Sequence, residues 1–352
     1  MKLLIIGGTQ FLGRHLSASA VASNHDVTLF NRGNHPSPPH VETIHGDRNT
    51  DLAKLGARHW DVVIDTCGMF PNSVRASAEF LSDSVDRYVY ISSQSAYADV
   101  SNAGVKENAP LATLTTEQLE EASQIEKSGS TNYGKLYGGL KALCEQAAER
   151  AMPEHVLILR PGLIVGPDDY TDRFTYWAVR IAQGGEVLAP GREQQFVQFI
   201  DVRDLAEWII RMVEINAHGI YNTSGALETV TMQELLEECR TVSQSDASFT
   251  WVSEEFLLKE NVAAWSDMPL WLPEDAAPHL RGFMFIDSDK AVSAGLHYRP
   301  LDSTVRDTLE WYRTTRANEK LKAGIDRDRE VSVLRKWREH IEATSHSASS
   351  QT

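Results

Sequence analysis

The chain is poor in cysteine, has no long apolar run and carries fewer basic than acidic residues. Its three cysteines, Cys67, Cys144 and Cys239, are odd in number and show no metal-ligand spacing. The sequence therefore predicts neither a disulfide framework nor a zinc site. We expect all three to be buried, reduced thiols.

No apolar stretch approaches the roughly 20 residues that a membrane-spanning helix needs. The first residues enter a predicted strand directly, without the basic segment and cleavage site of a secretory signal. We therefore expect a cytoplasmic protein with no membrane partner.

The deficit of basic residues bears on the choice of ligand. The 49 acidic residues against 34 basic ones give a formal net charge of −15, which repels phosphate backbones. We therefore expect a small-molecule substrate rather than a nucleic acid. The histidines His35, His40 and His45 lie in a proline-rich loop, but their spacing suits ligands on neither a helix nor a strand, so no metal site is predicted.

A glycine-rich stretch near the start is the first strong structural signal. Residues 3–6 are apolar without alternation, which is typical of a parallel strand covered on both faces. Residues 11–22 have helical spacing, and residues 26–30 form a second short apolar run. This βαβ pattern places a loop at a helix N-terminus, where free amide groups and the helix dipole suit a pyrophosphate. The candidate contacts are Gly7, Thr9, Gln10, Phe11, Leu12 and Gly13.

The loop departs from the usual glycine pattern at one position. Gly7 and Gly13 occupy the first and last positions of a GxxGxxG loop, but Gln10 replaces the middle glycine. The alternative interpretation is a plain tight turn between a strand and a helix.

The second predicted strand ends in Asn31, Arg32 and Gly33. Proteins that prefer NAD often place an acidic residue here to bind the ribose 2′-hydroxyl, and this chain has none. Asn31 does not repel a 2′-phosphate and Arg32 can pair with one, so NADP(H) is favoured over NAD(H). The alternative is that Arg32 is a solvated loop charge.

Residues 41–44 and 60–65 predict the next two strands, followed by Asp47 and Cys67 respectively. The carboxyl ends of parallel strands form the edge at which open α/β sheets bind ligands. Both residues are therefore candidate cofactor contacts. Asp47 is suited to hydrogen-bonding the adenine, or else caps a turn.

A further predicted strand, residues 87–92, leads into Ser93, which is placed to meet a ligand. Later, Tyr137 is followed by Lys141 at the i+4 position, so the two share a helix face. A lysine ammonium beside a phenol stabilises the phenolate and suits the tyrosine to acid/base work. Gly138 and Gly139 inside this helix indicate that something packs closely there. The alternative is a chance pairing on a solvated helix.

Together the stretches GGTQFLG, YISSQSAY, YGGLK and LRPGLIVGP resemble the extended short-chain dehydrogenase/reductase superfamily, within the NAD-dependent epimerase/dehydratase family, over roughly residues 1–315. The resemblance implies a doubly wound Rossmann sheet and a homodimer. It also implies a catalytic triad of Ser93, Tyr137 and Lys141, with Lys141 holding the nicotinamide ribose, and a nicotinamide lined by Pro161 and Gly162.

Two departures from the nucleotide-sugar members concern the substrate. Leu163 stands where those members usually carry an asparagine, and Val197 aligns with an arginine that holds the sugar-nucleotide pyrophosphate. We therefore expect a substrate other than a nucleotide sugar. The loop with Gln10 also resembles the GGT-type loop of proteins related to chloroplast stem-loop RNA-binding proteins.

The length of 352 residues and a 42% hydrophobic content suit a large α/β domain with a smaller lobe. We expect a helix over residues 205–215 capped by Asp204, and a helix from Thr231 with a capping box to Glu234. The aromatic-rich residues 251–285 predict either a lid over the substrate or lobe core. The expected parts are a Rossmann domain of residues 1–165 with 198–215 returning to it, a substrate lobe of 166–197 and 216–325, a C-terminal helix of 326–342, and a disordered tail of 343–352.

The function expected from this sequence is NAD(P)-dependent redox chemistry at an alcohol or carbonyl carbon of a small molecule. One alternative is a nucleotide-sugar epimerase or dehydratase. The other is a Rossmann scaffold that binds RNA or protein without catalysis.

Overall fold

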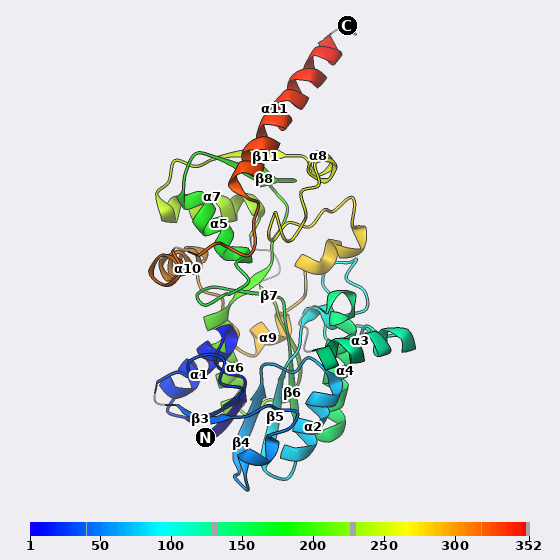
Figure 1. Ribbon diagram of the computed structural model, residues 1–352, viewed down its shortest axis with the longest axis vertical. Coiled ribbons are helices and arrows are strands. Elements are labelled where there is room, and N and C mark those ends of the chain that lie inside the picture. Colours follow the sequence, from blue (N-terminus) through cyan, green and yellow to red (C-terminus); the bar gives the residue numbers. More distant parts are fainter. Residues whose placement is uncertain (40, 129–132, 226–229, 318, 350–352) are drawn as a thin grey trace. The chain divides into compact units, whose positions relative to one another are not determined.

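The computed structural model describes residues 1–39, 41–128, 133–225, 230–317 and 319–349 (Figure 1). The chain divides into two compact units. The first comprises Met1–Ile164, Gln198–Leu227 and Gly282–Tyr298, and the second comprises Val165–Val197, Glu228–Arg281 and Arg299–Thr352.

The first unit is built on a seven-stranded sheet in which every neighbouring pair is parallel. The strand order is β10-β6-β5-β4-β1-β2-β3, which confirms the predicted doubly wound α/β fold. The strands are β1 (Lys2–Ile6), β2 (Asp26–Asn31), β3 (Glu42–His45), β4 (Trp60–Asp65), β5 (Val85–Ile91), β6 (Val156–Pro161) and β10 (Gly219–Thr223).

Strand β10 explains why the division differs from the predicted one. Residues 216–325 are predicted to belong to the substrate lobe, yet β10 hydrogen-bonds to β6 and completes the central sheet. Residues 282–298 also belong to the first unit. The run Gly219–Thr223 is short and half polar, so its own sequence does not predict a strand of a buried sheet.

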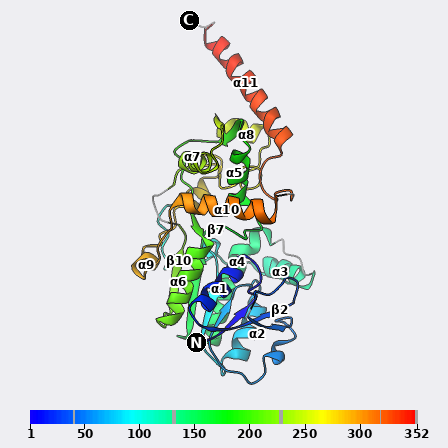
Figure 2. The ribbon, with the colours of Figure 1, turned by 90° about the vertical axis from the view of Figure 1, so that its left-hand side faces the viewer.

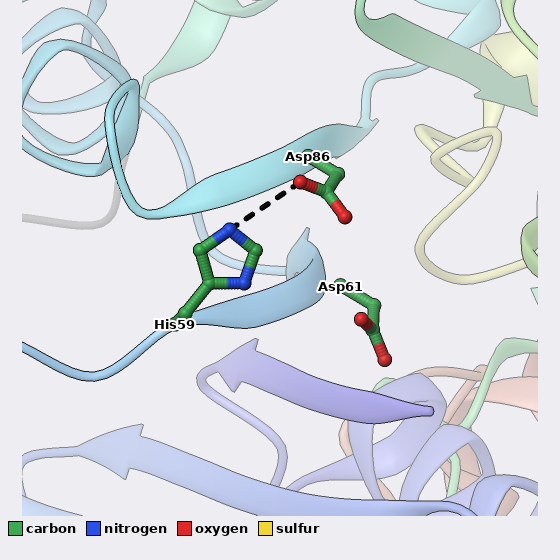
Figure 3. Close-up of side chains that lie close together, drawn as sticks. All are labelled: His59, Asp61 and Asp86. Carbon is green, nitrogen blue, oxygen red and sulfur yellow. Dashed lines mark ion pairs between the residues drawn. The ribbon is translucent and has the colours of Figure 1, made fainter.

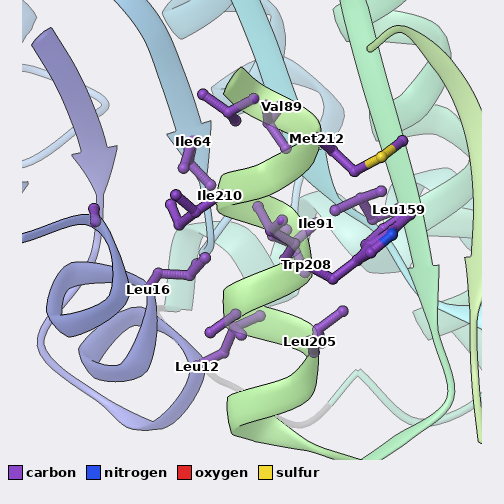
Figure 4. Packing of buried hydrophobic residues seen from close by; sticks show 14 of the residues in the cluster. Leu12, Leu16, Ile64, Val89, Ile91, Leu159, Leu205, Trp208, Ile210 and Met212 are labelled. Atoms are coloured by element: carbon purple, nitrogen blue, oxygen red, sulfur yellow. The ribbon is translucent and has the colours of Figure 1, made fainter. Parts of the chain in front are cut away.

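Helices cover both faces of this sheet. On one face, α1 (Phe11–Ala22) and α6 (Val202–Glu214) pack on strand residues such as Ile5 and Ile64. Figure 4 shows Leu12 and Leu16 of α1 beside the α6 side chains in this layer. On the other face, α2 (Pro71–Leu81) and α4 (Tyr137–Ala151) pack on the alternate strand residues, such as Leu4 and Val63. Side chains of successive strand residues point to opposite faces, so both faces need apolar residues.

Shorter elements complete the first unit and its edges. They are η1 (Leu52–Leu55), η2 (Gln94–Ala96), α3 (Thr116–Ser128), η3 (Gly134–Leu136), β7 (Leu163–Val165), β9 (Phe199–Asp201), η4 (Pro278–Met284) and α9 (Asp289–Ser293). Helix α6 begins earlier than predicted, and its N-cap is Asp201, whose side chain accepts from the Arg203 amide. The prediction that Asp204 caps it was wrong, because Asp204 lies inside the first turn.

The second unit combines a small sheet (Figure 1) with the helices labelled in Figure 2. Strand β8 (Glu186–Pro190) pairs in parallel with β11 (Ser248–Val252). The helices are α5 (Arg173–Ala182), α7 (Met232–Ser243), α8 (Glu254–Lys259), α10 (Leu301–Thr315) and α11 (Arg327–Ser349). The predicted capping box of Thr231 and Glu234 is present at the start of α7.

The C-terminal helix is longer than expected. Helix α11 continues to Ser349, so the prediction of a disordered tail from residue 343 was wrong for residues 343–349. Residues 350–352 lie outside the described chain. Within the second unit, Trp337 of α11 packs on Phe256, with ring centroids 4.9 Å apart.

The aromatic-rich residues 251–285 do not form one element. Phe256 and Trp271 are buried in the second unit, and the buried Trp177 donates from Nε1 to the carbonyl of Pro269, so core packing accounts for this part. Phe283 and Phe285 belong to the first unit.

Two further sequence-based expectations concern thiols and membranes. Cys144 and Cys239 are buried and free, whereas Cys67 is exposed, so the expectation that all three thiols are buried was wrong for Cys67. Among the described residues, no helix combines the length and apolarity needed to cross a bilayer.

The contact at Gly13 yields a stability prediction. A Cβ added at Gly13 would lie 2.6 Å from the Gly8 Cα, and backbone cannot yield as a flexible side chain does. We expect Gly13→Ala to lower the free energy of unfolding by about 1–3 kcal/mol, measured by urea denaturation. Val21→Ala, at an exposed position of the same helix, should change it by less than about 0.5 kcal/mol. Equal stability of the two variants would contradict the close packing.

A buried carboxyl in the second unit predicts a pH dependence. Burial raises the pKa of Asp169 to about 6, and its Oδ2 has no hydrogen-bond partner in the described chain. The folded state therefore holds this proton more tightly than the unfolded chain. Relative to Asp169→Asn, the natural protein should lose about 2 kcal/mol of stability as the pH rises from about 4 to about 7. Urea unfolding across this range tests the sign, with the exposed Asp275→Asn as the control.

Candidate active site

The loop between β1 and α1 has the backbone of a phosphate cradle. Gly7 and Gly8 adopt φ values of +101° and +84°, which residues other than glycine rarely adopt. A Cβ at Gly7 would lie 2.4 Å from the Thr66 Oγ1. Gln10 is exposed and occupies the N-cap of α1 without a side-chain capping hydrogen bond. The loop therefore approaches its neighbours as closely as an anion-binding turn must.

A pocket of about 330 Å³ opens beside this loop, at the lower end of the usual range for ligand sites. Residues from the ends of β1, β2, β3 and β4 line it together with parts of α2 and α3. Of the predicted cofactor contacts, the pocket brings together Gly7, Thr9, Gln10, Asn31, Arg32, Asp47 and Cys67.

The remaining predicted contacts lie elsewhere. Leu12 and Gly13 are buried in α1 and Phe11 is half-buried against the core, so the side chains of Phe11 and Leu12 and the backbone of Gly13 serve packing. Ser93, Tyr137, Lys141, Pro161 and Gly162 also do not line this pocket.

Asn31 and Arg32 differ in what they do at the end of β2. The Asn31 Nδ2 donates to the Gly7 carbonyl over 3.3 Å, and its Oδ1 accepts from the Gly33 amide. Asn31 thus ties the glycine loop to the following turn. Arg32 is exposed at the pocket, and its guanidinium forms no ion pair within the described chain.

Arg48, which lines the pocket, forms a largely buried ion pair with Asp65. The Arg48 Nη2 lies 2.7 Å from the Asp65 Oδ2, which also accepts from the Tyr88 hydroxyl. Burial raises the pKa of Asp65, but the pairing with Arg48 outweighs it and holds the pKa below its ordinary value. Arg48 is therefore committed to structure. The Asp47 Oδ1 accepts from the Asn49 amide, so Asp47 caps a turn.

Helix α4 is attached to the end of β5 at three successive turns. A Cβ at Gly138 would lie 2.1 Å from the Ser95 carbonyl oxygen, which confirms the expected close packing on this face. The Lys141 Nζ donates to the carbonyls of Ile91 and Gly68 over 2.6 and 3.0 Å. One turn further, Glu145 accepts a hydrogen bond from the Ser92 hydroxyl.

This attachment sets the surroundings of the predicted triad. The Ser93 Oγ accepts from the Ser95 amide over 3.1 Å, in the turn that rests on Gly138. Tyr137 begins α4, is half-buried, and has its ring centroid 6.5 Å from that of Tyr133. Lys141 is buried above the Tyr90 ring.

The predicted nicotinamide-lining pair follows β6. Pro161 ends this strand and is buried, and Gly162 comes next. A Cβ at Gly162 would lie 2.6 Å from the Gln94 Oε1 and 2.7 Å from the Ser224 Oγ. Glycine is therefore required here by packing.

A buried polar network below the triad was not predicted. Arg160 donates from Nε and Nη2 to both carboxylate oxygens of Glu145 over 2.9 and 2.6 Å, and from Nη1 to the Tyr97 hydroxyl. The Tyr97 hydroxyl donates to Asn222 of β10. The spacing of Tyr137, Lys141 and Glu145 at every fourth residue is the sequence signal that points to Glu145.

One group of possible metal ligands lies at the opposite edge of the sheet. Figure 3 shows His59, Asp61 and Asp86 at the beginnings of β4 and β5. The Asp61 Oδ2 already accepts from the Lys2 amide over 2.6 Å, and His59 pairs with Asp86, so ordinary contacts account for this group. His35 lines the pocket, and His40 lies outside the described residues.

The chain is similar in sequence to a known protein family and to two characterised proteins. A family model described as the NAD dependent epimerase/dehydratase family matches residues 3–223. The chloroplast stem-loop binding protein of 41 kDa b from Arabidopsis thaliana is 28% identical over 258 residues, which cover 68% of this chain and 62% of that protein. The 2-alkyl-3-oxoalkanoate reductase of Stenotrophomonas maltophilia is 29% identical over 219 residues, which cover 59% and 64%. The chain thus spans less than two thirds of either relative.

Solved structures support the fold. UDP-N-acetylglucosamine 4-epimerase from Methanobrevibacter ruminantium superposes with a TM-score of 0.65 at 17% identity, over 89% of this chain and 98% of that one. The human epimerase family protein SDR39U1, solved with NADPH, superposes with a TM-score of 0.58 at 18% identity, over 88% and 99%.

The buried pair below the triad predicts a large effect on stability. Glu145→Ala leaves the Arg160 guanidinium buried without its carboxylate, which should cost about 3–5 kcal/mol, measured by chemical denaturation. Glu149→Ala, at an exposed position one turn later, is the matched control. A loss below about 1 kcal/mol for Glu145→Ala would show that the pair does not hold α4 to β6.

Proposed function

Because this chain belongs to the NAD dependent epimerase/dehydratase family, we propose that it is an NAD(P)-dependent oxidoreductase. It acts at an alcohol or carbonyl carbon of a small molecule. The observation that carries the proposal is the attachment of α4 to the end of β5. There Lys141 binds the carbonyl of Ile91, two residues before Ser93, and the carbonyl of Gly68, next to the pocket residue Cys67.

Each member of the triad then has a chemical role. The Ser93 Oγ accepts from the Ser95 amide, which leaves its own hydrogen to donate to the substrate oxygen. Tyr137 exchanges a proton with that oxygen. In this proposal the Lys141 ammonium stabilises the tyrosine as phenolate and holds the nicotinamide ribose. When bound, the nicotinamide supplies or accepts the hydride.

The residues around the pocket fit a dinucleotide. Gly7 and Gly8 have positive φ values and suit a loop that opens its backbone to a pyrophosphate, and a side chain at Gly7 would clash with Thr66. Arg32, exposed at the pocket without an ion-pair partner in the described chain, suits a 2′-phosphate. We therefore propose NADP(H) as the preferred cofactor.

Two other functions have some support. The solved structures include nucleotide-sugar epimerases, but Leu163 and Val197 are buried apolar residues that offer no polar contact to a sugar nucleotide. The Arabidopsis relative is named a stem-loop binding protein, which favours RNA binding. A net charge of −15 opposes this second function, and the bacterial relative is named a reductase.

Titration with NADPH and NADH, followed by nicotinamide fluorescence, tests the proposal without knowledge of the substrate. NADPH should bind more tightly than NADH. Arg32→Ala should weaken NADPH binding about tenfold and leave NADH binding unchanged, because one charged hydrogen bond to the 2′-phosphate is lost. Tyr137→Phe should retain binding, and Arg75→Ala, at an exposed position of α2, should match the natural protein.

Two results would count against the proposal. If neither cofactor binds, Gln10 marks a loop that no longer holds a dinucleotide, and the scaffold function is favoured. If Arg32→Ala weakens the binding of NADPH and NADH equally, Arg32 supports the loop and does not recognise the 2′-phosphate.

A further inference from the structure

The pocket beside the glycine loop has an acidic residue that no step above uses. Glu126, in the last turn of α3, lines this pocket together with Asn49 and Ser73. Arg32, in contrast, is a cation without an ion-pair partner in the described chain, and it lines the same pocket. A ligand that carries only negative groups would suit Arg32 but not Glu126.

The Glu126 carboxylate is held in place by a short chain of hydrogen bonds. The Ser73 Oγ lies 3.2 Å from the Glu126 Oε1 and 2.6 Å from the Asn49 side-chain oxygen position. A serine hydroxyl has one hydrogen, so the Ser73 hydroxyl is shared between two acceptors, the Asn49 Oδ1 and the Glu126 Oε1. The second carboxylate oxygen, Oε2, has no hydrogen-bond partner within the described chain.

Helix α3 itself is anchored beside the pocket by apolar contacts. Ala122 is buried with Leu136 and Leu140, and Phe70 and Ile125 pack against them. Phe70 also lines the pocket. The carboxylate is therefore presented from a packed helix, next to an aromatic side chain against which a flat base can lie.

We propose that Glu126 is the residue that recognises the base of the dinucleotide, by accepting a hydrogen bond from the 6-amino group of adenine. This inference rests on the proposed function, because it assumes that a dinucleotide occupies the pocket. A carboxylate only accepts hydrogen bonds. It therefore favours a base with an exocyclic amino group and repels one that presents a carbonyl oxygen at the same position.

The chemistry also orients the ligand. Phosphate groups are repelled by Glu126 and attracted by Arg32, so the phosphorylated ribose and the base are directed to different residues of one pocket. The pair thus selects an adenosine 2′-phosphate group over other nucleotides.

The test uses adenosine 2′,5′-bisphosphate, NADPH and the hypoxanthine analogue of NADPH, in which a carbonyl oxygen replaces the 6-amino group. Calorimetric titration measures the affinity of each for the natural protein, Glu126→Ala, Glu126→Gln and the control Glu121→Ala, an exposed residue of the same helix. Melting temperatures and circular dichroism establish that each variant is folded.

We expect the natural protein to prefer NADPH to the hypoxanthine analogue by about tenfold or more, the usual effect of one hydrogen bond to a charged group. Glu126→Ala should weaken the binding of NADPH and of adenosine 2′,5′-bisphosphate by a similar factor. The affinity for the hypoxanthine analogue should stay the same or increase. Glu126→Gln keeps an acceptor oxygen and should restore part of the preference. Glu121→Ala should behave as the natural protein.

Three outcomes would overturn the inference. If NADPH and its hypoxanthine analogue bind equally well to the natural protein, and also equally well to Glu126→Ala, recognition by this carboxylate is excluded. Equal weakening of all three ligands in Glu126→Ala would assign Glu126 a structural role. Failure of NADPH and adenosine 2′,5′-bisphosphate to bind the natural protein would remove the proposed function itself, and this inference with it.

Discussion

The attachment of α4 to the end of β5 is the interaction on which the candidate active site depends. Glycine at position 138 lets the helix rest on the Ser95 carbonyl, and the buried Lys141 and Glu145 then bind Ile91 and Ser92. The three contacts come from successive turns of α4, and each joins its turn to a residue at the end of β5 or just after it. This close approach packs the start of α4, next to Tyr137, on the turn that follows Ser93.

Charges buried below the site give this arrangement its rigidity. The Glu145–Arg160 pair connects α4 to β6, and the Arg48–Asp65 pair connects the loop after β3 to the end of β4. Both pairs are surrounded by further hydrogen bonds, to Tyr97 and to Tyr88. Buried ions need such partners because they have lost their contact with water. The two pairs therefore fix α4 to β6 and the loop after β3 to β4, the strands on either side of β5.

Local patterns in the sequence predicted the first unit well. The apolar runs of β1 and β4 and the helical spacing of α1 match the observed elements closely, because a parallel sheet buried on both faces demands uninterrupted apolar strands. The match to the family model over residues 3–223 confirms the family that these motifs predicted. The error over the cap of α6 arose because both Asp201 and Asp204 suit an N-cap, and the backbone decides between them.

The sequence by itself determined the doubly wound fold, the family and which residue types gather at the carboxyl edge of the sheet, since these follow from the period of the apolar pattern and the order of motifs. Only the tertiary structure decided that β10 joins the sheet, that Asn31 ties the glycine loop while Arg32 is exposed at the pocket, and that Glu126 faces the same pocket from α3. These features bring together residues that are far apart along the chain. A local sequence pattern contains no information about how close such residues lie in space.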